Sequence, residues 1–190
     1  MNKLIDAAWS LHQFFTENKI PYTIIGGFAL QFWGEPRFTQ DIDVTVLSEP
    51  KKEKELVNLL LKKYSSRISN PDEFALKNRI VLLKIKKDVP ADISLGIYGY
   101  EEGVIERSIA VELEDGKKIN ICSAEDLIIH KAFAGRPRDV QDIEGVIFRQ
   151  QNKLDIRLIR KWLKEFSSLL PKISVKENFE NPWKKFKKIT

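Results

Sequence analysis

The 190-residue chain has little of what several classes of site require. It has one cysteine, Cys122, so no internal disulfide can form, and we expect a protein of the reducing cytoplasm. We interpret Cys122 as a small hydrophobic residue of a strand rather than as a catalytic thiol. The two histidines, His12 and His130, have no partners at the spacing of metal ligands or of a catalytic triad. A zinc site and a serine or cysteine hydrolase are therefore not expected.

Long apolar segments are also missing. No run reaches the roughly 18–20 residues that span a membrane, and the N-terminus lacks the apolar centre of a signal peptide. Hydrophobic residues make up 43% of the chain and charged residues 31%, as in folded domains. We therefore expect a folded protein with no membrane partner.

The charge of the chain is moderately basic. The formal net charge is +5 and the sequence pI is about 9.2, which favours an anionic partner such as a nucleoside triphosphate or a nucleic acid. Residues 182–188 alternate aromatic side chains with lysines, a pattern that can grip RNA through stacking and phosphate contacts. A solvated, partly ordered tail is the alternative, and it is the one that we favour.

Hydrophobic periodicity predicts an α+β fold. A helix is expected over residues 4–15 and another from 28, followed by a lysine-rich helix after Pro50. Short strands are expected at 22–25, 41–47, 80–85 and 91–95, and a hairpin at 109–121 with its turn at Asp115-Gly116.

The last third is expected to be helical. Ser123 and Asp126 have the spacing of a capping box, and three helical patterns follow. We therefore predict a small mixed sheet flanked by helices in residues 1–122. Residues 123–190 are predicted to be a helical region that closes one side of a cleft and carries the basic tail.

Two carboxylates mark the first candidate site. Asp41 and Asp43 flank Ile42 in a predicted strand, where alternate side chains share a face, so both acids point the same way. A divalent cation such as Mg²⁺ relieves their repulsion and leaves positions open for water and phosphate. Two solvated acids on an open strand face are the alternative.

A third carboxylate, Asp92, lies in the later strand around residues 91–95. If that strand pairs near the first, three acids share one face and can bind two metal ions. A surface acid is the alternative for Asp92, because the strand order does not follow from one sequence.

A glycine turn precedes the acidic pair. Gly26-Gly27 lies between a strand and a helix, where a backbone without Cβ atoms can approach a phosphate and helix amides point at anions. Arg37 and Thr39 come just before the acidic strand and are candidates for contacts to phosphate oxygens. Taken alone, a common turn and a surface arginine explain these residues as well.

Taken in order, these elements resemble the nucleotidyltransferase superfamily of DNA polymerase β, the tRNA CCA-adding enzymes and the aminoglycoside nucleotidyltransferases. The resemblance covers about half of the chain. It implies that Gly26 and Gly27 hold the triphosphate, and that Asp41, Asp43 and Asp92 are the catalytic, metal-binding acids for two Mg²⁺ ions. Many members have Gly-Ser at the turn, so a hydroxyl contact to phosphate is missing here.

A second block resembles the bacterial AbiEii-type branch of the superfamily. Residues 123–131 run into Lys131, and Arg138-Asp139 with Asp142 follow on the next predicted helix. The resemblance implies that Lys131 reaches the nucleotide phosphates and that Arg138, Asp139 and Asp142 line the far wall of the cleft. The alternatives are a Lys131 that extends to solvent and an ordinary ion pair between Arg138 and Asp142.

The sequence thus predicts a metal-dependent enzyme that moves a nucleoside monophosphate from a nucleoside triphosphate onto an acceptor hydroxyl. The AbiEii-type resemblance implies a toxin-like enzyme that acts on tRNA and pairs with an antitoxin protein. A small-molecule acceptor such as an antibiotic is one alternative. A non-catalytic protein that binds nucleotide or RNA with the same fold is the other.

Overall fold

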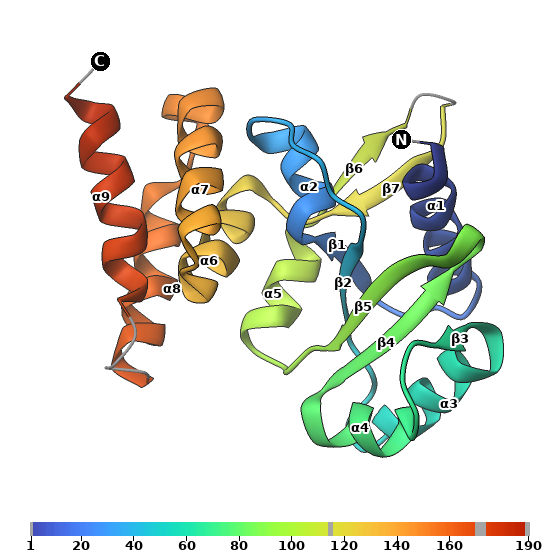
Figure 1. Ribbon diagram of the computed structural model, residues 1–190. Helices are drawn as coiled ribbons and strands as arrows, with labels where there is room; N and C mark the ends of the chain where they lie inside the picture. The colour runs from blue at the N-terminus through green and yellow to red at the C-terminus, as the bar shows by residue number, and fades with distance from the viewer. Residues whose placement is uncertain (1, 114–115, 170–173, 189–190) are drawn as a thin grey trace. The chain divides into compact units, whose positions relative to one another are not determined.

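The computed structural model describes residues 2–113, 116–169 and 174–188, so Asp115 of the predicted hairpin turn lies outside the described residues. The chain divides into two compact units (Figure 1). Residues 1–28 and 38–122 form the first unit, and residues 29–37 and 123–190 form the second. Among the described helices, none is both long and apolar enough to cross a membrane.

A seven-stranded mixed sheet is the centre of the first unit. Its strand order is β3-β4-β5-β2-β1-β7-β6. The parallel pairs are β1 with β7 and β2 with β5, and the other neighbours are antiparallel. The strands are β1 (Tyr22–Ile25), β2 (Ile42–Val46), β3 (Ser65–Ser66), β4 (Ile80–Ile85), β5 (Val89–Leu95), β6 (Ile109–Glu112) and β7 (Lys118–Ile121). The small mixed sheet predicted from the sequence is confirmed.

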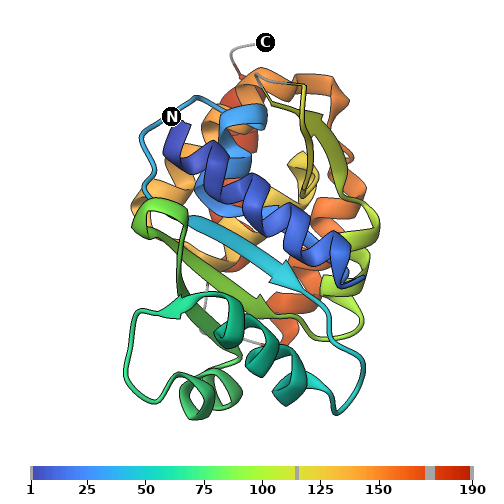
Figure 2. The same ribbon diagram turned by 90° about the vertical axis from the view of Figure 1, so that its right-hand side faces the viewer.

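Helices cover both faces of this sheet. α1 (Asn2–Glu17) packs against β2, β4, β5 and β7, and in Figure 2 it runs in front of the sheet. α5 (Tyr100–Glu106) contacts β1 and β2 from the other side (Figure 1). α3 (Glu53–Lys63) and α4 (Pro71–Asn78) pack together beside β3 and β4. The sequence predicted α1 and α3, but α4 and α5 are only eight and seven residues long and give little periodic signal.

Strand alternation decides which residues leave the core. In β5 the odd-numbered residues from Val89 to Leu95 are buried, and Asp92 and Ser94 between them are only partly covered. In β2, Ile42 and Val44 are fully buried and Asp43 is partly covered. The acids therefore lie on one face of the sheet, and the apolar side chains of the same strands lie on the other.

The second unit is helical. It contains the end of α2 (Gly26–Trp33) and the helices α6 (Ala124–Ala134), α7 (Pro137–Gln150), α8 (Ile156–Leu169) and α9 (Val175–Lys187), as Figure 1 shows. Ser123 caps α6, since its Oγ accepts a hydrogen bond of 3.0 Å from the Asp126 amide and donates one of 2.8 Å to the Asp126 carboxylate. The predicted helix start at Ser123 and the three predicted helices are confirmed.

The partly ordered tail that we favoured from the sequence is wrong. Val175, Phe179 and Trp183 follow one another at four-residue intervals, and all are buried on one side of α9. The alternation of lysines and aromatics in residues 182–188 does not reveal this four-residue spacing, which begins seven residues earlier. The apolar stripe folds the segment as a helix, and the lysines lie on its exposed side.

Candidate active site

The acid site consists of Asp41, Asp43 and Asp92 in the first unit. β2 and β5 are parallel neighbours, and their register places Asp43 directly beside Asp92. Two residues paired in this way carry their side chains on the same face, on strands about 4.7–4.9 Å apart. Asp41 precedes β2 by one residue, and its negative charge acts on the Asp92 carboxyl. The fold thus gathers the three acids that the sequence singled out.

Arg67 pairs with the third acid. It follows β3, its amide donates to the Leu82 carbonyl of β4 at 3.0 Å, and its guanidinium donates to the Asp92 carboxylate. Its buried Nε has no hydrogen-bond partner among the described residues. Burial raises the pKa of the Asp92 carboxyl and the Asp41 charge acts in the same direction, whereas Arg67 opposes them. No sequence signal indicated Arg67, because its contact depends on the strand order β3-β4-β5.

The acid site suits a metal ion that is shared with a substrate. In the described part of the chain, no group of three histidine, cysteine or acidic side chains is drawn closely enough to hold an ion alone. Mg²⁺ usually takes one or two carboxylates from the protein and fills its remaining positions with water and substrate phosphates. The adjacent carboxylates of Asp43 and Asp92, with Asp41 beside them, fit that donor set.

The backbone conformation at position 26 and the neighbouring Asp43 side chain both require a glycine there. The φ of Gly26 is +65°, a left-handed conformation that side chains disfavour. A Cβ placed on Gly26 would lie 1.9 Å from Oδ2 of Asp43, well inside van der Waals contact. The glycine turn is therefore packed directly against the acid site, and no larger residue fits there.

Gly27 leaves room for a hydroxyl from another part of the chain. A Cβ on Gly27 would lie 2.6 Å from Oγ1 of Thr39. That hydroxyl donates a 2.7 Å hydrogen bond to Asp41. The nucleotidyltransferases that the sequence resembles often have a serine at this position. In this protein Thr39 fills the space that a serine side chain on residue 27 would occupy.

Four of the remaining predicted residues, Arg37, Lys131, Asp139 and Asp142, form an ion-pair network in the second unit, which Arg136 joins from its exposed side. We call it the buried ion-pair network, because Lys131, Asp139 and Asp142 are buried. The Lys131 side chain is 6% exposed, and its Nζ donates to Asp142 at 2.6 Å and to Asp139 at 3.3 Å. The alternative of a lysine that extends to solvent is wrong. Arg37 holds the same Asp142 with two hydrogen bonds of 2.8 Å.

Asp139 anchors the start of α7 in this network. Its carboxylate accepts from the Arg136 amide at 3.3 Å and from the Arg136 Nε at 2.6 Å. Burial alone raises the pKa of Asp139 and Asp142, but hydrogen bonds from Arg136, Arg37 and Lys131 outweigh it and hold both values below the ordinary range. Arg138, on the same helix, is exposed. The structure thus brings Arg37, Lys131, Asp139 and Asp142 together as one charged cluster.

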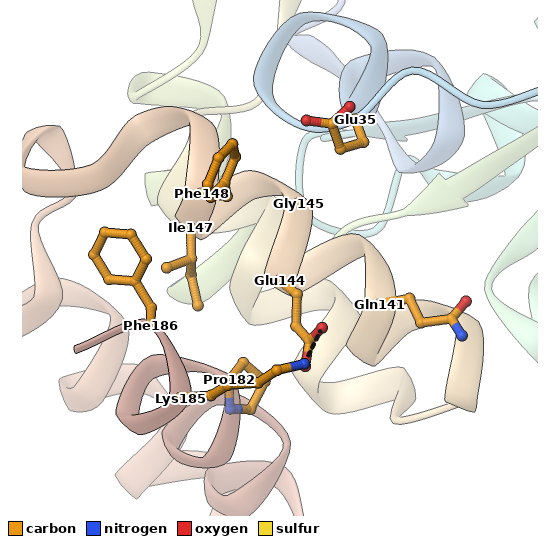
Figure 3. A pocket seen from close by; sticks show the side chains of 9 residues that line it. All are labelled: Glu35, Gln141, Glu144, Gly145, Ile147, Phe148, Pro182, Lys185 and Phe186. Atoms are coloured by element: carbon orange, nitrogen blue, oxygen red, sulfur yellow. Dashed lines mark hydrogen bonds and ion pairs between the residues drawn. The ribbon is translucent and has the colours of Figure 1, made fainter. Parts of the chain in front are cut away.

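A separate hollow of about 350 Å³ lies between α7 and α9 in the second unit (Figure 3). Ile147, Phe148 and Phe186 give it an apolar lining, and a 3.0 Å ion pair between Lys185 and Glu144 lies at its edge. None of the predicted site residues lines it. It is therefore distinct from both the acid site and the buried ion-pair network.

Comparison with known proteins identifies the fold. The family model described as "Nucleotidyltransferase of unknown function (DUF6036)" matches residues 2–190. A comparison with curated protein sequences finds no significant match.

Several solved structures resemble this chain. An antigenic nucleotidyltransferase-like protein from Paracoccidioides brasiliensis has a TM-score of 0.54 at 17% identity, with 92% of this chain and 93% of that one covered. ANT(2'')-Ia in complex with adenylyl-2''-tobramycin has a TM-score of 0.54 at 17% identity, with 86% and 97% covered. Lincomycin-bound lincosamide antibiotic adenylyltransferase LnuA has a TM-score of 0.50 at 14% identity, with 74% and 94% covered. At these identities the likeness concerns the fold.

Proposed function

Since the chain belongs to the nucleotidyltransferases of unknown function of family DUF6036, we propose that it moves a nucleoside monophosphate from a nucleoside triphosphate onto an acceptor hydroxyl. The acceptor oxygen attacks the α-phosphate, and pyrophosphate leaves. The observation that carries the proposal is the register of β2 and β5, which places Asp43 beside Asp92 and next to the glycine turn. A binding module has little use for three carboxylates gathered at one place, whereas a site for Mg²⁺ and a triphosphate requires them.

Each residue of the acid site has a role in this proposal. Asp41 and Asp43, and with them Asp92 for a second ion, would hold Mg²⁺, which supplies charge neutralisation at the phosphates when bound. The alternative role of Asp92 is to accept the proton of the acceptor hydroxyl, a role favoured by the raised pKa of its carboxyl. The amides of the Gly26-Gly27 turn bind phosphate oxygens.

Three further side chains would complete the phosphate contacts. Thr39 supplies the hydroxyl that the turn itself lacks, since its Oγ1 lies beside the position of a Gly27 side chain. Arg37 and Lys131 supply positive charge, and Asp139 and Asp142 fix the position of the lysine. Such a site works mainly by positioning and electrostatics.

The direct test is incubation of the protein with each α-labelled nucleoside triphosphate, Mg²⁺ and total tRNA, with label on RNA as the readout. We expect transfer by the parent protein and by Asp72→Asn, a control on the exposed start of α4. No transfer with any nucleotide, together with intact triphosphate binding, would leave the non-catalytic alternative in place.

A small-molecule acceptor is the second candidate. It is favoured by the structural likeness to ANT(2'')-Ia with adenylyl-2''-tobramycin and to lincomycin-bound LnuA. The same assay with tobramycin and lincomycin in place of tRNA separates the two. Label on an antibiotic and none on RNA would decide for the small molecule.

A toxin-like role with an antitoxin protein is part of the proposal only through the AbiEii-type resemblance. Induced expression should then arrest growth, and Asp43→Asn should remove the arrest. Growth unaffected by the active parent protein would count against the toxin role and would leave the transfer chemistry untouched.

A further inference from the structure

A cationic groove lies between α8 and α9 in the second unit, and no residue of the proposed catalytic machinery is among its lining residues. Its volume is about 380 Å³. We call it the lysine groove, and its lining is Arg160, Leu163 and Lys164 from α8 and Lys176, Glu180 and Lys184 from α9. Leu163 is buried and forms part of the lining, and the four basic side chains are exposed.

The positive charges of the lysine groove outnumber its one negative charge. Both oxygens of Glu180 are already bonded to Arg160, at 2.7 and 3.0 Å. The charges of Lys176 and Lys184 also act on Glu180, so this one carboxylate is shared by three basic side chains. The ammonium groups of Lys164, Lys176 and Lys184 around one hollow repel each other, and an anion that binds all of them relieves that repulsion.

The charges also have a regular arrangement. Lys176, Glu180 and Lys184 are four residues apart, so they form one row along α9. The two lysines at the ends of the row are about 12 Å apart along the helix axis. One strand of a nucleic-acid duplex carries about three phosphates over that length.

The basic surface continues beyond the groove. Over residues 156–169 and 174–188, the helices α8 and α9 and their ends carry nine basic and three acidic side chains. On α8, Arg157, Arg160, Lys161 and Lys164 lie at three- and four-residue spacings, and all four are exposed. The net charge of +5 for the whole chain is therefore concentrated on this part of the second unit.

We propose that the lysine groove binds the phosphate backbone of RNA and holds the acceptor strand of the transfer reaction. The role of the bound RNA as acceptor rests on the proposed function, but the binding itself does not depend on catalysis. Charge complementarity decides for a polyanion with phosphates at short, regular intervals rather than for a single small anion. The chemistry involves no base contact, so the groove should bind RNA with little sequence preference.

The test compares two triple variants with the same change in charge. Lys164→Gln, Lys176→Gln and Lys184→Gln together remove the groove lysines. Lys54→Gln, Lys62→Gln and Lys77→Gln remove three exposed lysines from α3 and α4 of the first unit. Fluorescence anisotropy with labelled tRNA, without nucleotide, gives the affinity, and melting curves check that both variants are folded.

We expect the groove variant to bind at least about tenfold more weakly, because three phosphate contacts are lost, and the control to stay within about twofold. The slope of log affinity against log salt concentration should become shallower by about two in the groove variant. Equal losses in both variants, or none in either, would overturn the proposal. If polyglutamate binds as tightly as RNA and is lost in the same variant, the groove fits an acidic protein instead and the RNA assignment fails.

Asp43→Asn separates this inference from the proposed function. We expect that variant to bind RNA like the parent protein, because the acid site is no part of the groove. RNA binding with no nucleotidyl transfer by the parent would sink the proposed function and leave the groove assignment standing. Transfer to tRNA with an unchanged KM in the groove variant would overturn the groove assignment and leave the proposed function standing.

Discussion

At the scale of single residues, the glycine turn shows how one side chain determines which neighbours are tolerated. Gly26 faces the Asp43 carboxylate and Gly27 faces the Thr39 hydroxyl, so both positions are closed to a Cβ for different reasons. Although the turn lacks the serine of the Gly-Ser pattern, the Thr39 hydroxyl lies beside it.

The first prediction follows from that contact. Gly27→Ser should displace Thr39 from its hydrogen bond to Asp41 and destabilise the protein by about 1–3 kcal/mol, the usual cost of overpacking. Gly27→Ser combined with Thr39→Ala should recover most of the stability and place the hydroxyl on the turn. Denaturant unfolding and triphosphate affinity measure both effects. A single variant as stable as the parent would show that Thr39 moves aside freely.

The second prediction concerns His130. Burial lowers the pKa of His130 to about 4, from an ordinary value of 6.5. Between these values the unfolded chain binds the proton and the folded chain does not, so stability falls as the pH drops from 6.5 towards 4. The contribution at pH 4.5 amounts to about 2–3 kcal/mol.

Urea unfolding at pH 7 and pH 4.5 tests this assignment. His130→Gln removes the titrating group, so its loss of stability between the two pH values should be smaller than that of the parent. The acids of the buried ion-pair network titrate below this window, because their pKa values are lowered from 3.8. An identical pH response in parent and variant would assign the effect to other groups.

Residue-level prediction from sequence succeeded where the chemistry is local. The strand that carries Asp43 and the strand that ends just before Gly26 are visible in short windows, and the structure has both, although β2 begins at Ile42, one residue after Asp41. Arg67 could not be predicted, because 25 residues separate it from Asp92 and only the folded sheet brings the two together.

At the scale of elements, α6 and α7 exist as predicted, and the buried ion-pair network joins them. Lys131 on α6 is shared by Asp139 and Asp142 on α7, and Arg37 binds Asp142 from the segment after α2. Hydrogen bonds from Arg149 to the Gly34 carbonyl and from Gln150 to the Trp33 carbonyl tie the other end of α7 to the end of α2. Lys131 thus has a structural role in this protein, as the shared partner of two buried carboxylates.

The third prediction tests that structural part. Lys131→Met should destabilise the protein by about 3–5 kcal/mol, because two buried carboxylates lose a shared partner. Lys54→Met, at an exposed position of α3, should change stability by less than about 0.5 kcal/mol. Adding Asp139→Asn to Lys131→Met should restore part of the loss, since one unpaired charge is removed. A Lys131→Met protein as stable as the control would mean that the network contributes nothing.

Elements were predictable in proportion to their length. α1, α7 and α8 run for 14 to 16 residues and show their periodicity plainly, whereas β3 has two residues and α5 has seven. α9 is the exception, because the alternation of aromatic side chains with lysines in residues 182–188 suggested a solvated tail.

At the scale of the whole molecule, the acid site depends on sheet order. Between β2 and its neighbour β5, the chain passes through α3, β3, α4 and β4 before it returns to pair with β2 in parallel. Only that return places Asp92 beside Asp43. A single sequence shows both strands but not their adjacency, so the position of Asp92 beside Asp43 could not be predicted from it.

The central claim is that the acid site performs nucleotidyl transfer, and the most direct measurement combines transfer rate with stability in Asp41→Asn and Asp43→Asn. An amide nearly preserves the shape of the side chain and removes the charge that attracts Mg²⁺. Transfer should therefore fall by at least about a hundredfold. The Tm of the metal-free protein should hold or rise slightly, because one of several adjacent like charges is gone. Folded variants that transfer label as fast as the parent would contradict the account.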